Sequence, residues 1–181
     1  MAAFGFGVSR RQRRPYPSGM SNPVVLGDLL SPDSIHLHLP CAAKEALLAQ
    51  LVERVPELHG QPEARLKLLR ALLEREQLHS TGVGDGIALP HARNALVGLV
   101  NTPCIVFGRC SAGVDYGAVD NQPTRLFFLL IAPTVTQHLA ILARISRLLR
   151  DPVLRQGLLH APTTADVIRL VREAEARYLA G

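Results

Sequence analysis

The sequence predicts one α/β or α+β domain, in which helices and strands pack in layers around a single hydrophobic core. From Val24 onward, strand-like and helix-like patterns alternate along the chain, as they do in layered domains of this kind. The length of 181 residues fits one domain of ordinary size. Hydrophobic residues make up 48% of the chain and charged residues 19%, a balance that excludes disordered and collagen-like proteins.

The first strand and the first helix follow one another near the start of the domain. In residues 34–39 the apolar side chains of Ile35, Leu37 and Leu39 alternate with two histidines, which predicts a strand with two different faces. Residues 41–55 have the apolar spacing of an amphipathic helix, and a proline ends it.

A second helix leads into a glycine-rich segment. Pro62 suits the first turn of a helix that continues to about Glu76, and leucines supply its buried face. These leucines are Leu66, Leu69, Leu72 and Leu73. Residues 80–86, with the sequence STGVGDG, predict a tight turn into a short strand at residues 87–89.

The second half of the chain begins with two strands and ends in helices. Residues 103–109 and 125–131 are apolar runs of strand length, separated by a loop that contains the sequence DNQP. The predicted helices run over residues 136–150, 152–160 and 165–178, the second capped by Asp151 and the third by Thr163 or Thr164.

The net charge of +5 comes mostly from the first 20 residues. This segment holds four arginines and no acid, so the remaining chain has 16 basic and 15 acidic residues. Proline, serine and glycine follow the arginines where an export signal needs an apolar run. We therefore expect residues 1–20 to be a basic disordered extension, residues 21–181 to form the domain, and the protein to be cytoplasmic. Nucleic-acid binding through the extension is the less favoured alternative.

The cysteines and two neighbouring histidines give no disulfide or metal signal. Three cysteines, Cys41, Cys104 and Cys110, in a chain without a secretory signal predict reduced thiols. His36 and His38 share one face of the first strand but lack a third ligand, so a solvated polar face is expected. No apolar run approaches the roughly 20 residues of a membrane-spanning helix, so no membrane insertion is expected.

The glycine-rich segment and the Pro90-His91 pair are the candidates for chemistry. Glycines let backbone N–H groups turn toward an anion, but the G-x-G-x-G spacing matches neither a P-loop nor a dinucleotide-binding fingerprint. A simple tight turn and a phosphate cradle therefore both stay open. Pro90 fixes its own φ and lacks an N–H, so it places His91 at a rigid strand exit. Taken alone, His91 is either a solvated loop residue or a nucleophile that accepts a phosphoryl group.

Two arginines near His91 favour phosphoryl transfer. Such transfer requires stabilisation of the negative charge on the phosphoryl oxygens, which arginine side chains and backbone N–H groups provide. Arg93 lies two residues beyond His91, and Arg75 lies near the end of the helix that leads into the glycine-rich segment. Nucleophile, cations and glycines therefore fall close together in the sequence.

These segments resemble a known family. The stretch LLEREQLHSTGVGDGIALPHA, with AVDNQP and the later QHLA, is similar to the type-2 enzyme IIA domain of the bacterial phosphoenolpyruvate-dependent phosphotransferase system. The resemblance covers about residues 24–174, nearly the whole predicted domain. The DNQP sequence makes it most similar to the nitrogen-regulatory branch of the family.

The resemblance implies a three-layer α/β/α sandwich with a mixed sheet of four or five strands. It also implies that a small HPr-like carrier protein phosphorylates His91, with His138 beside the phosphate and Arg75 as a binding cation. No metal or cofactor is implied. The other residues of the expected phosphate-binding set are Ser80, Thr81, Gly82, Gly84 and Arg93.

The resemblance further implies a phosphohistidine carrier that regulates partner proteins according to its phosphorylation state. Targets of the nitrogen-regulatory branch include potassium transporters and sensor kinases. The alternative is a fructose- or mannitol-type enzyme IIA, which passes its phosphate to a IIB domain. Either role makes the protein a phosphotransferase component.

Overall fold

The computed structural model describes residues 24–40, 43–92 and 98–180. The predicted extension at residues 1–20, Cys41 and Arg93 lie outside the described residues. The elements occur in the order η1 (Leu26–Leu29), η2 (Pro32–Ser34), β1 (Ile35–His36), α1 (Lys44–Glu53), η3 (Pro56–Leu58), α2 (Pro62–Leu78), β2 (Gly82–Gly84), β3 (Ile87–Ala88), β4 (Cys104–Val114), β5 (Thr124–Ile131), α3 (Val135–Leu148), α4 (Pro152–His160) and α5 (Thr164–Ala180), where η denotes a 3-10 turn.

The strands form one mixed sheet in the order β1-β4-β5-β3-β2. β4 and β5 are antiparallel, with pairs that run from Cys104 opposite Ile131 to Arg109 opposite Leu126. β1 is parallel to β4 and β3 is parallel to β5, whereas β2 and β3 form an antiparallel hairpin. The predicted mixed sheet of four or five strands is confirmed, with five strands.

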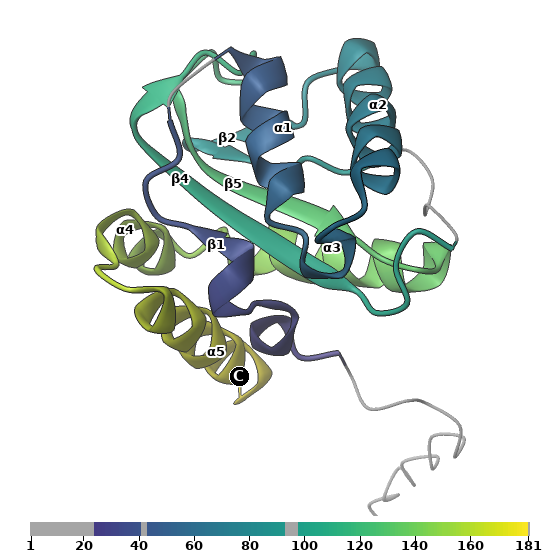
Figure 1. The fold of residues 1–181 in the computed structure, drawn as a ribbon. Coiled ribbons are helices and arrows are strands. Elements are labelled where there is room, and N and C mark those ends of the chain that lie inside the picture. The colour runs from purple at the N-terminus through teal and green to yellow at the C-terminus, as the bar shows by residue number, and fades with distance from the viewer. Residues whose placement is uncertain (1–23, 41–42, 93–97, 181) are drawn as a thin grey trace, which may run out of the picture.

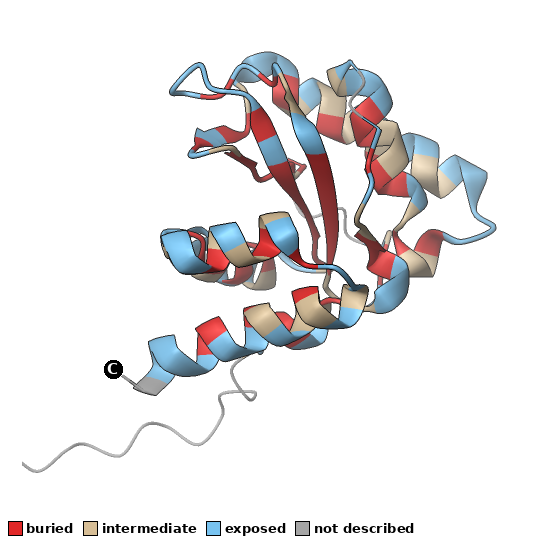
Figure 2. Cartoon of the chain, turned by 90° about the vertical axis from the view of Figure 1, so that its left-hand side faces the viewer, coloured by how far each residue is buried: buried red, intermediate tan, exposed pale blue. Residues whose placement is uncertain are grey.

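Helices cover both faces of this sheet (Figure 1). Side chains of β5 alternate between the two helix layers, as expected for a strand that is buried on both faces. Leu126, Phe128 and Leu130 pack with α3, α4 and α5. Phe127, Leu129 and Ile131 pack with α1 and α2. Figure 2 shows the result: the strands are mostly buried, and the exposed residues lie mainly on the outer faces of the helices. The predicted three-layer sandwich is confirmed.

Capping residues fix the starts of the last two helices as predicted. The Asp151 side chain accepts a hydrogen bond from the Val153 amide at 2.9 Å at the start of α4. Thr163 rather than Thr164 caps α5, since its hydroxyl accepts from the Asp166 amide at 3.1 Å. Side-chain acceptors at these positions satisfy N–H groups that have no partner within the helix.

The first strand is shorter than predicted. β1 holds two residues rather than the six of residues 34–39, and Ser34 belongs to a 3-10 turn instead. The reason lies partly in Arg109, a buried residue of β4 whose Nε donates to the Leu37 carbonyl at 3.0 Å. Because a side chain takes this carbonyl, Leu37 does not continue the ladder.

One leucine predicted to be buried in the second helix is exposed. Leu66 of α2 faces solvent, whereas Leu68 and Leu72 are buried. Residues four apart lie on the same side of a helix, so the buried side of α2 runs through Leu68 and Leu72. Leu69 and Leu73, also predicted to be buried, are half-buried beside this line.

The prediction of reduced cysteines is wrong for Cys110, which is disulfide-bonded. Cys104 is free, and burial together with the nearby charge of Glu57 raises the pKa of its thiol to about 12. A thiol with so high a pKa is a poor nucleophile, because the thiolate is the reactive form.

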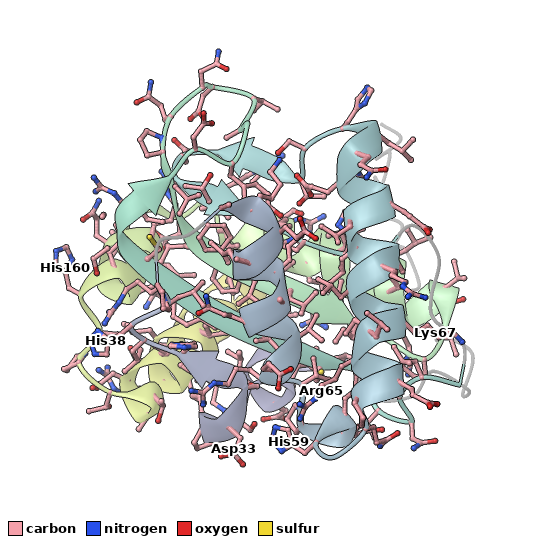
Figure 3. The ribbon with its side chains drawn as sticks, turned by 45° about the horizontal axis from the view of Figure 1, so that its top comes forward. Asp33, His38, His59, Arg65, Lys67 and His160 are labelled. Atoms are coloured by element: carbon pink, nitrogen blue, oxygen red, sulfur yellow. The ribbon has the colours of Figure 1, made fainter. Side chains whose placement is uncertain are left out.

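The histidines outside the Pro90-His91 segment lie mostly at the periphery. His38, His59 and His160 are exposed at the outer edges of the molecule (Figure 3). Among the described residues, no group of three or more His, Cys, Asp or Glu side chains is arranged to hold a metal ion. In the same part of the chain, no helix is both long enough and apolar enough to cross a membrane.

Candidate functional site

His91 lies where β3 stops pairing as a regular strand. β3 ends at Ala88, and Pro90 has no N–H to donate to a neighbouring strand. The Pro90 carbonyl accepts a hydrogen bond from the Leu130 amide at 3.0 Å, and His91 itself forms an isolated parallel bridge with Leu130. Pairing to β5 therefore continues through the proline and fixes the backbone that carries the half-buried imidazole.

A backbone hydrogen bond decides which ring nitrogen of His91 is free. Nδ1 lies 2.7 Å from the Leu89 carbonyl oxygen. Since a carbonyl oxygen only accepts hydrogen bonds, Nδ1 must carry the proton. In the neutral ring the lone pair is then on Nε2. Nε2 is therefore the ring nitrogen that has a lone pair available for a new bond.

A second imidazole, that of His138, lies directly beside the first. α3 begins after Thr134, whose hydroxyl accepts from the Gln137 amide at 3.3 Å, and this cap places His138 in the first turn. Its side chain is on the buried side of α3, and the residue is only 6% exposed. The ring centroids of His91 and His138 are 5.4 Å apart, with the planes tilted by 51°. His91, just after β3, and His138, in the first turn of α3, thus form a pair of neighbouring imidazoles.

Burial is the largest influence on both histidines and lowers the pKa of each, because the charged ring loses water. The hydrogen bond to Leu89 opposes this effect by raising the pKa of His91. The charge of Arg75 lowers that pKa further, and the charge of Glu76 raises it. The charge of His91 adds to the lowering at His138. Both rings are therefore neutral near pH 7, which is the form required of a nucleophile.

Arg75 brings a cation to the same end of the sheet. It lies in the last turn of α2, where positive charge is favourable at the helix C-terminus. One guanidinium nitrogen donates to the His79 carbonyl at 2.7 Å. A guanidinium has five N–H donors, so others are available for an anion. Its influence on the pKa of His91 indicates that its charge acts on the imidazole.

Glu76, which the sequence reasoning did not assign to the site, binds Thr81 at the start of the β2–β3 hairpin. Its carboxylate accepts from the Thr81 amide at 3.0 Å, from the Thr81 hydroxyl at 2.6 Å and from Lys44 Nζ at 3.1 Å. Burial alone raises the pKa of Glu76, but these hydrogen bonds and the Lys44 charge outweigh it and lower the pKa. A signal was present in the sequence, since Glu76 follows the buried Leu68 and Leu72 at spacings of four.

The hydrogen bonds of the glycine-rich segment are made within the protein. Thr81 donates both its amide and its hydroxyl to Glu76. The Gly82 amide donates to the Ser80 hydroxyl at 3.1 Å, and that hydroxyl donates to the Tyr116 carbonyl at 2.7 Å. These donors therefore shape the hairpin in this conformation and are not free for a phosphate.

Strand register places the predicted phosphate-binding residues of the glycine-rich segment at different distances from His91. Gly84 pairs with Ile87, four residues before His91 along an extended chain, which corresponds to about 13 Å. The Thr81 carbonyl accepts from the Leu89 amide at 3.0 Å, so the start of the hairpin is nearer. The structure thus brings together His91, His138 and Arg75, and leaves Gly84 at the far end of the hairpin.

Comparison with known proteins identifies the class to which this fold and site belong. Residues 28–174 match the family model described as "Phosphoenolpyruvate-dependent sugar phosphotransferase system, EIIA 2". The match spans most of the chain, so the protein belongs to this family of phosphotransferase components. The resemblance inferred from the sequence is confirmed.

Its relatives include both regulatory and sugar-specific members of the family. The "Nitrogen regulatory protein" of Bradyrhizobium diazoefficiens is 36% identical over 157 residues, which cover 83% of this chain and 90% of that protein. The "PTS system fructose-specific EIIABC component" of Bacillus subtilis is 36% identical over 148 residues, which cover 81% of this chain and 23% of that protein. The structure of "Nitrogen Regulatory Protein IIA-Ntr" from Neisseria meningitidis is similar with a TM-score of 0.71 at 25% identity, covering 82% of this chain and 99% of that one. The similarity to the nitrogen-regulatory branch is thereby confirmed.

Proposed function

We propose that the protein carries a phosphoryl group on His91 and acts as a regulatory member of the nitrogen-related phosphotransferase system. The phosphoryl donor is a small HPr-like carrier protein. The observation that carries this proposal is the His91 ring, whose Nδ1 donates its proton to the Leu89 carbonyl and which lies beside the His138 ring, with the charge of Arg75 acting on it. Membership of the EIIA type-2 family supports it.

The transfer is a direct displacement between two imidazoles. The Nε2 lone pair of His91 attacks the phosphorus of a phosphohistidine on the carrier. A nitrogen–phosphorus bond forms at His91 as the bond in the donor breaks, and its electrons return to the donor ring nitrogen. The His91 ring gains positive charge during this step. The hydrogen bond to the Leu89 carbonyl and the charge of Glu76 both favour that charge, as their effects on the pKa indicate.

The neighbouring residues stabilise the transferred group. A neutral His138 retains one N–H, which donates to a phosphoryl oxygen, and Arg75 offsets the negative charge. We assign these roles to side chains rather than to Thr81 and Gly82, since the amides of both donate within the hairpin. Arg93 stays in the proposed phosphate-binding set because of its place in the sequence, two residues beyond His91.

Phosphorylation then changes which proteins the carrier binds. A phosphohistidine brings nearly two negative charges to the surface, and such a change creates or repels a basic partner site. By resemblance to the nitrogen-regulatory branch, the proposed targets are potassium transporters or sensor kinases. The proposed location of these events is the cytoplasm.

Radiolabelled phosphoenolpyruvate, with the first enzyme of the system and the HPr-like carrier, tests the proposal. Wild-type protein is expected to be labelled, and a His91→Ala variant is not. Labelling of His91→Ala at the wild-type level would refute the assignment of the phosphorylated residue. Pull-downs with the phosphorylated and unphosphorylated forms test the regulatory role, and identical partner sets would contradict it.

The similarity to fructose-specific relatives favours one alternative, a sugar-transport role. In that role the labelled protein passes its phosphate to a fructose- or mannitol-type IIB domain. Rapid loss of label to such a domain would support the alternative. Stable label in its presence would support the regulatory role.

A further inference from the structure

Lys44 occupies a position where a positive charge is locally unfavourable. It is the first residue of α1, and the preceding Ala43 gives this helix no side-chain cap. The dipole of a helix favours negative charge at its N-terminus and opposes a cation there. The chain contains only two lysines, Lys44 and Lys67. The favourable contacts of Lys44 are therefore those that it makes outside α1.

The Lys44 side chain reaches from α1 to the segments that surround the glycine-rich segment. Its Nζ lies 3.1 Å from Oε1 of Glu76 in α2 and 4.5 Å from the ring centroid of Tyr116, which is a cation–π contact. A Cβ atom added at Gly117 would lie 3.8 Å both from Lys44 Nζ and from Ser80 Oγ. The ammonium group therefore lies close to the start of the glycine-rich segment.

Glu76 connects this ammonium group to His91 through a series of hydrogen bonds. The Glu76 carboxylate accepts from the amide and the hydroxyl of Thr81. The Thr81 carbonyl accepts from the Leu89 amide at 3.0 Å, and the Leu89 carbonyl accepts from His91 Nδ1 at 2.7 Å. These bonds fix the carboxylate relative to the imidazole. The charge of Glu76 acts on His91 and favours the positive form of its ring.

Lys44 balances the charge of Glu76, but it is not the main reason that Glu76 is charged. Burial, the largest influence, raises the pKa of the Glu76 carboxyl group. Each of the two hydrogen bonds from Thr81 lowers that pKa more than the hydrogen bond or the charge of Lys44 does. Within the described part of the chain, Lys44 forms the only ion pair of Glu76. Removal of the Lys44 charge is therefore expected to leave a buried anion without a balancing cation.

The balance of these charges becomes important when His91 carries a phosphoryl group, which adds nearly two negative charges. The Glu76 side chain is only 5% exposed, so water and salt screen its charge weakly. An unbalanced carboxylate would therefore repel the phosphoryl group. The ammonium group of Lys44 reduces this repulsion, because two opposite charges 3.1 Å apart produce a weaker field at a distance than either charge alone.

We propose that Lys44 stabilises the phosphorylated form of His91 through Glu76, by offsetting the carboxylate that would otherwise repel the phosphoryl group. Lys44 is thus a positioning residue, since it acts through Glu76 and is assigned no contact with the phosphate. The inference rests on the proposed function and adds a residue that sets the equilibrium of transfer. The carboxylate that fixes the hairpin would, without Lys44, shift the phosphoryl group back toward the carrier protein.

The equilibrium of phosphoryl transfer between the radiolabelled HPr-like carrier and the full chain tests this inference. The label on each protein is measured once its distribution no longer changes. Lys44→Met is expected to lower the equilibrium constant for transfer to His91 about tenfold, because Glu76 then repels the phosphoryl group. Lys44→Arg keeps the charge and should retain most of the wild-type value.

Two further variants separate the charge of Lys44 from its packing. Glu76→Gln keeps an acceptor oxygen for the Thr81 amide but removes the negative charge, so it is expected to raise the equilibrium constant above the wild-type value. The double variant Lys44→Met/Glu76→Gln has neither charge and should lie close to wild type. An equal fall in Lys44→Met and in the double variant would overturn the inference, because loss of packing would then be the cause.

Lys67→Met is the matched control. Lys67 is exposed on the outer side of α2 (Figure 3), and its replacement makes the same change in net charge. A wild-type equilibrium constant in Lys44→Met, or an equal fall in both lysine variants, would overturn the inference. Urea denaturation shows whether each variant is folded. If Lys44→Met is unfolded, Glu76→Gln decides, since an unchanged equilibrium constant there would also contradict the inference. Absence of label from His91 in wild-type protein would instead refute the proposed function, so the two failures are distinguishable.

Discussion

The two sides of the β2–β3 hairpin use their polar groups in opposite ways. On the side of α1 and α2, the Glu76 carboxylate accepts three hydrogen bonds from Thr81 and Lys44. On the side of α3, His91 and His138 lie ring beside ring, and within the described residues Nε2 of His91 has no hydrogen-bond partner. The first arrangement is complete without a ligand, and the second is not.

This difference indicates that the Glu76 network fixes the geometry of this edge of the sheet, whereas the imidazole pair is the part that can react. A buried carboxylate whose acceptor sites are occupied holds one geometry, because breaking any of its bonds leaves a buried group unpaired. An imidazole with a free lone pair is ready to form a new bond. We therefore expect changes in the Glu76 network to alter stability, and changes around the two imidazoles, including Arg75 at the end of α2, to alter the rate of transfer.

Among changes in the Glu76 network, Glu76→Ala has the largest expected effect on the free energy of unfolding. It leaves the amide and hydroxyl of Thr81 without an acceptor and removes the partner of Lys44. We expect the free energy of unfolding to fall by about 2–4 kcal/mol, measured by urea denaturation. Glu173→Ala is the control, because Glu173 forms an exposed ion pair with Arg169 and is expected to cost less than about 1 kcal/mol. Equal losses in the two variants would remove the structural distinction.

Among changes around the two imidazoles, His138→Ala has the largest expected effect on the rate of phosphoryl transfer. Loss of the N–H beside the phosphoryl group should lower the rate of transfer to His91 by roughly 100-fold, as removal of a transition-state donor does elsewhere. Rapid-quench labelling measures this rate. His138→Gln retains an N–H donor and should recover part of the loss. A wild-type rate in His138→Ala would show that the second imidazole only packs against the first.

Arg75→Ala is expected to lower the same rate about tenfold, a smaller effect because other donors share the phosphate charge. Arg75→Lys keeps the positive charge and should recover part of the rate. Single-turnover labelling separates the variants. If Lys and Ala at this position give the same rate, the role of Arg75 lies in its bond to the His79 carbonyl rather than in its charge.

The pH dependence is the smallest expected effect. The pKa values of His91 and His138 are lowered in the folded protein, mainly by burial. As pH falls below the ordinary histidine value of about 6.5, the unfolded chain takes up protons first, so the free energy of unfolding falls with pH in that range. Urea denaturation between neutral and mildly acidic pH measures this slope. A matching slope in a His138→Gln variant would show that His138 does not contribute.

The sequence predicted the parts of the fold that local patterns control. The apolar run of β5, the cap Asp151 and the choice of Thr163 or Thr164 as the last cap were found, because burial on both faces and helix capping leave local signals. The segment from Ser80 to His91 was assigned to a turn and a strand exit for the same reason. His138 was assigned through resemblance, since nothing local relates it to a strand exit 47 residues earlier.

The features that were missed depend on contacts between distant segments. β1 is short because the Arg109 side chain takes the Leu37 carbonyl, and these residues are 72 apart in the sequence. The network in which Glu76 accepts from Thr81 and from Lys44, 32 residues away, was not predicted, although Thr81 was placed at the site as a phosphate ligand. A helical pattern that includes one acidic residue on its buried side, as at Glu76, is the signal that would have indicated this network.

Long-range proton–nitrogen NMR of the His91 ring, before and after phosphorylation, tests the central claim most directly. We predict a proton on Nδ1 in the unphosphorylated protein and a phosphorus coupling at Nε2 after labelling, because the Leu89 carbonyl accepts only from a protonated Nδ1. A proton on Nε2 in the free protein, or phosphorus attached to Nδ1, would contradict the account.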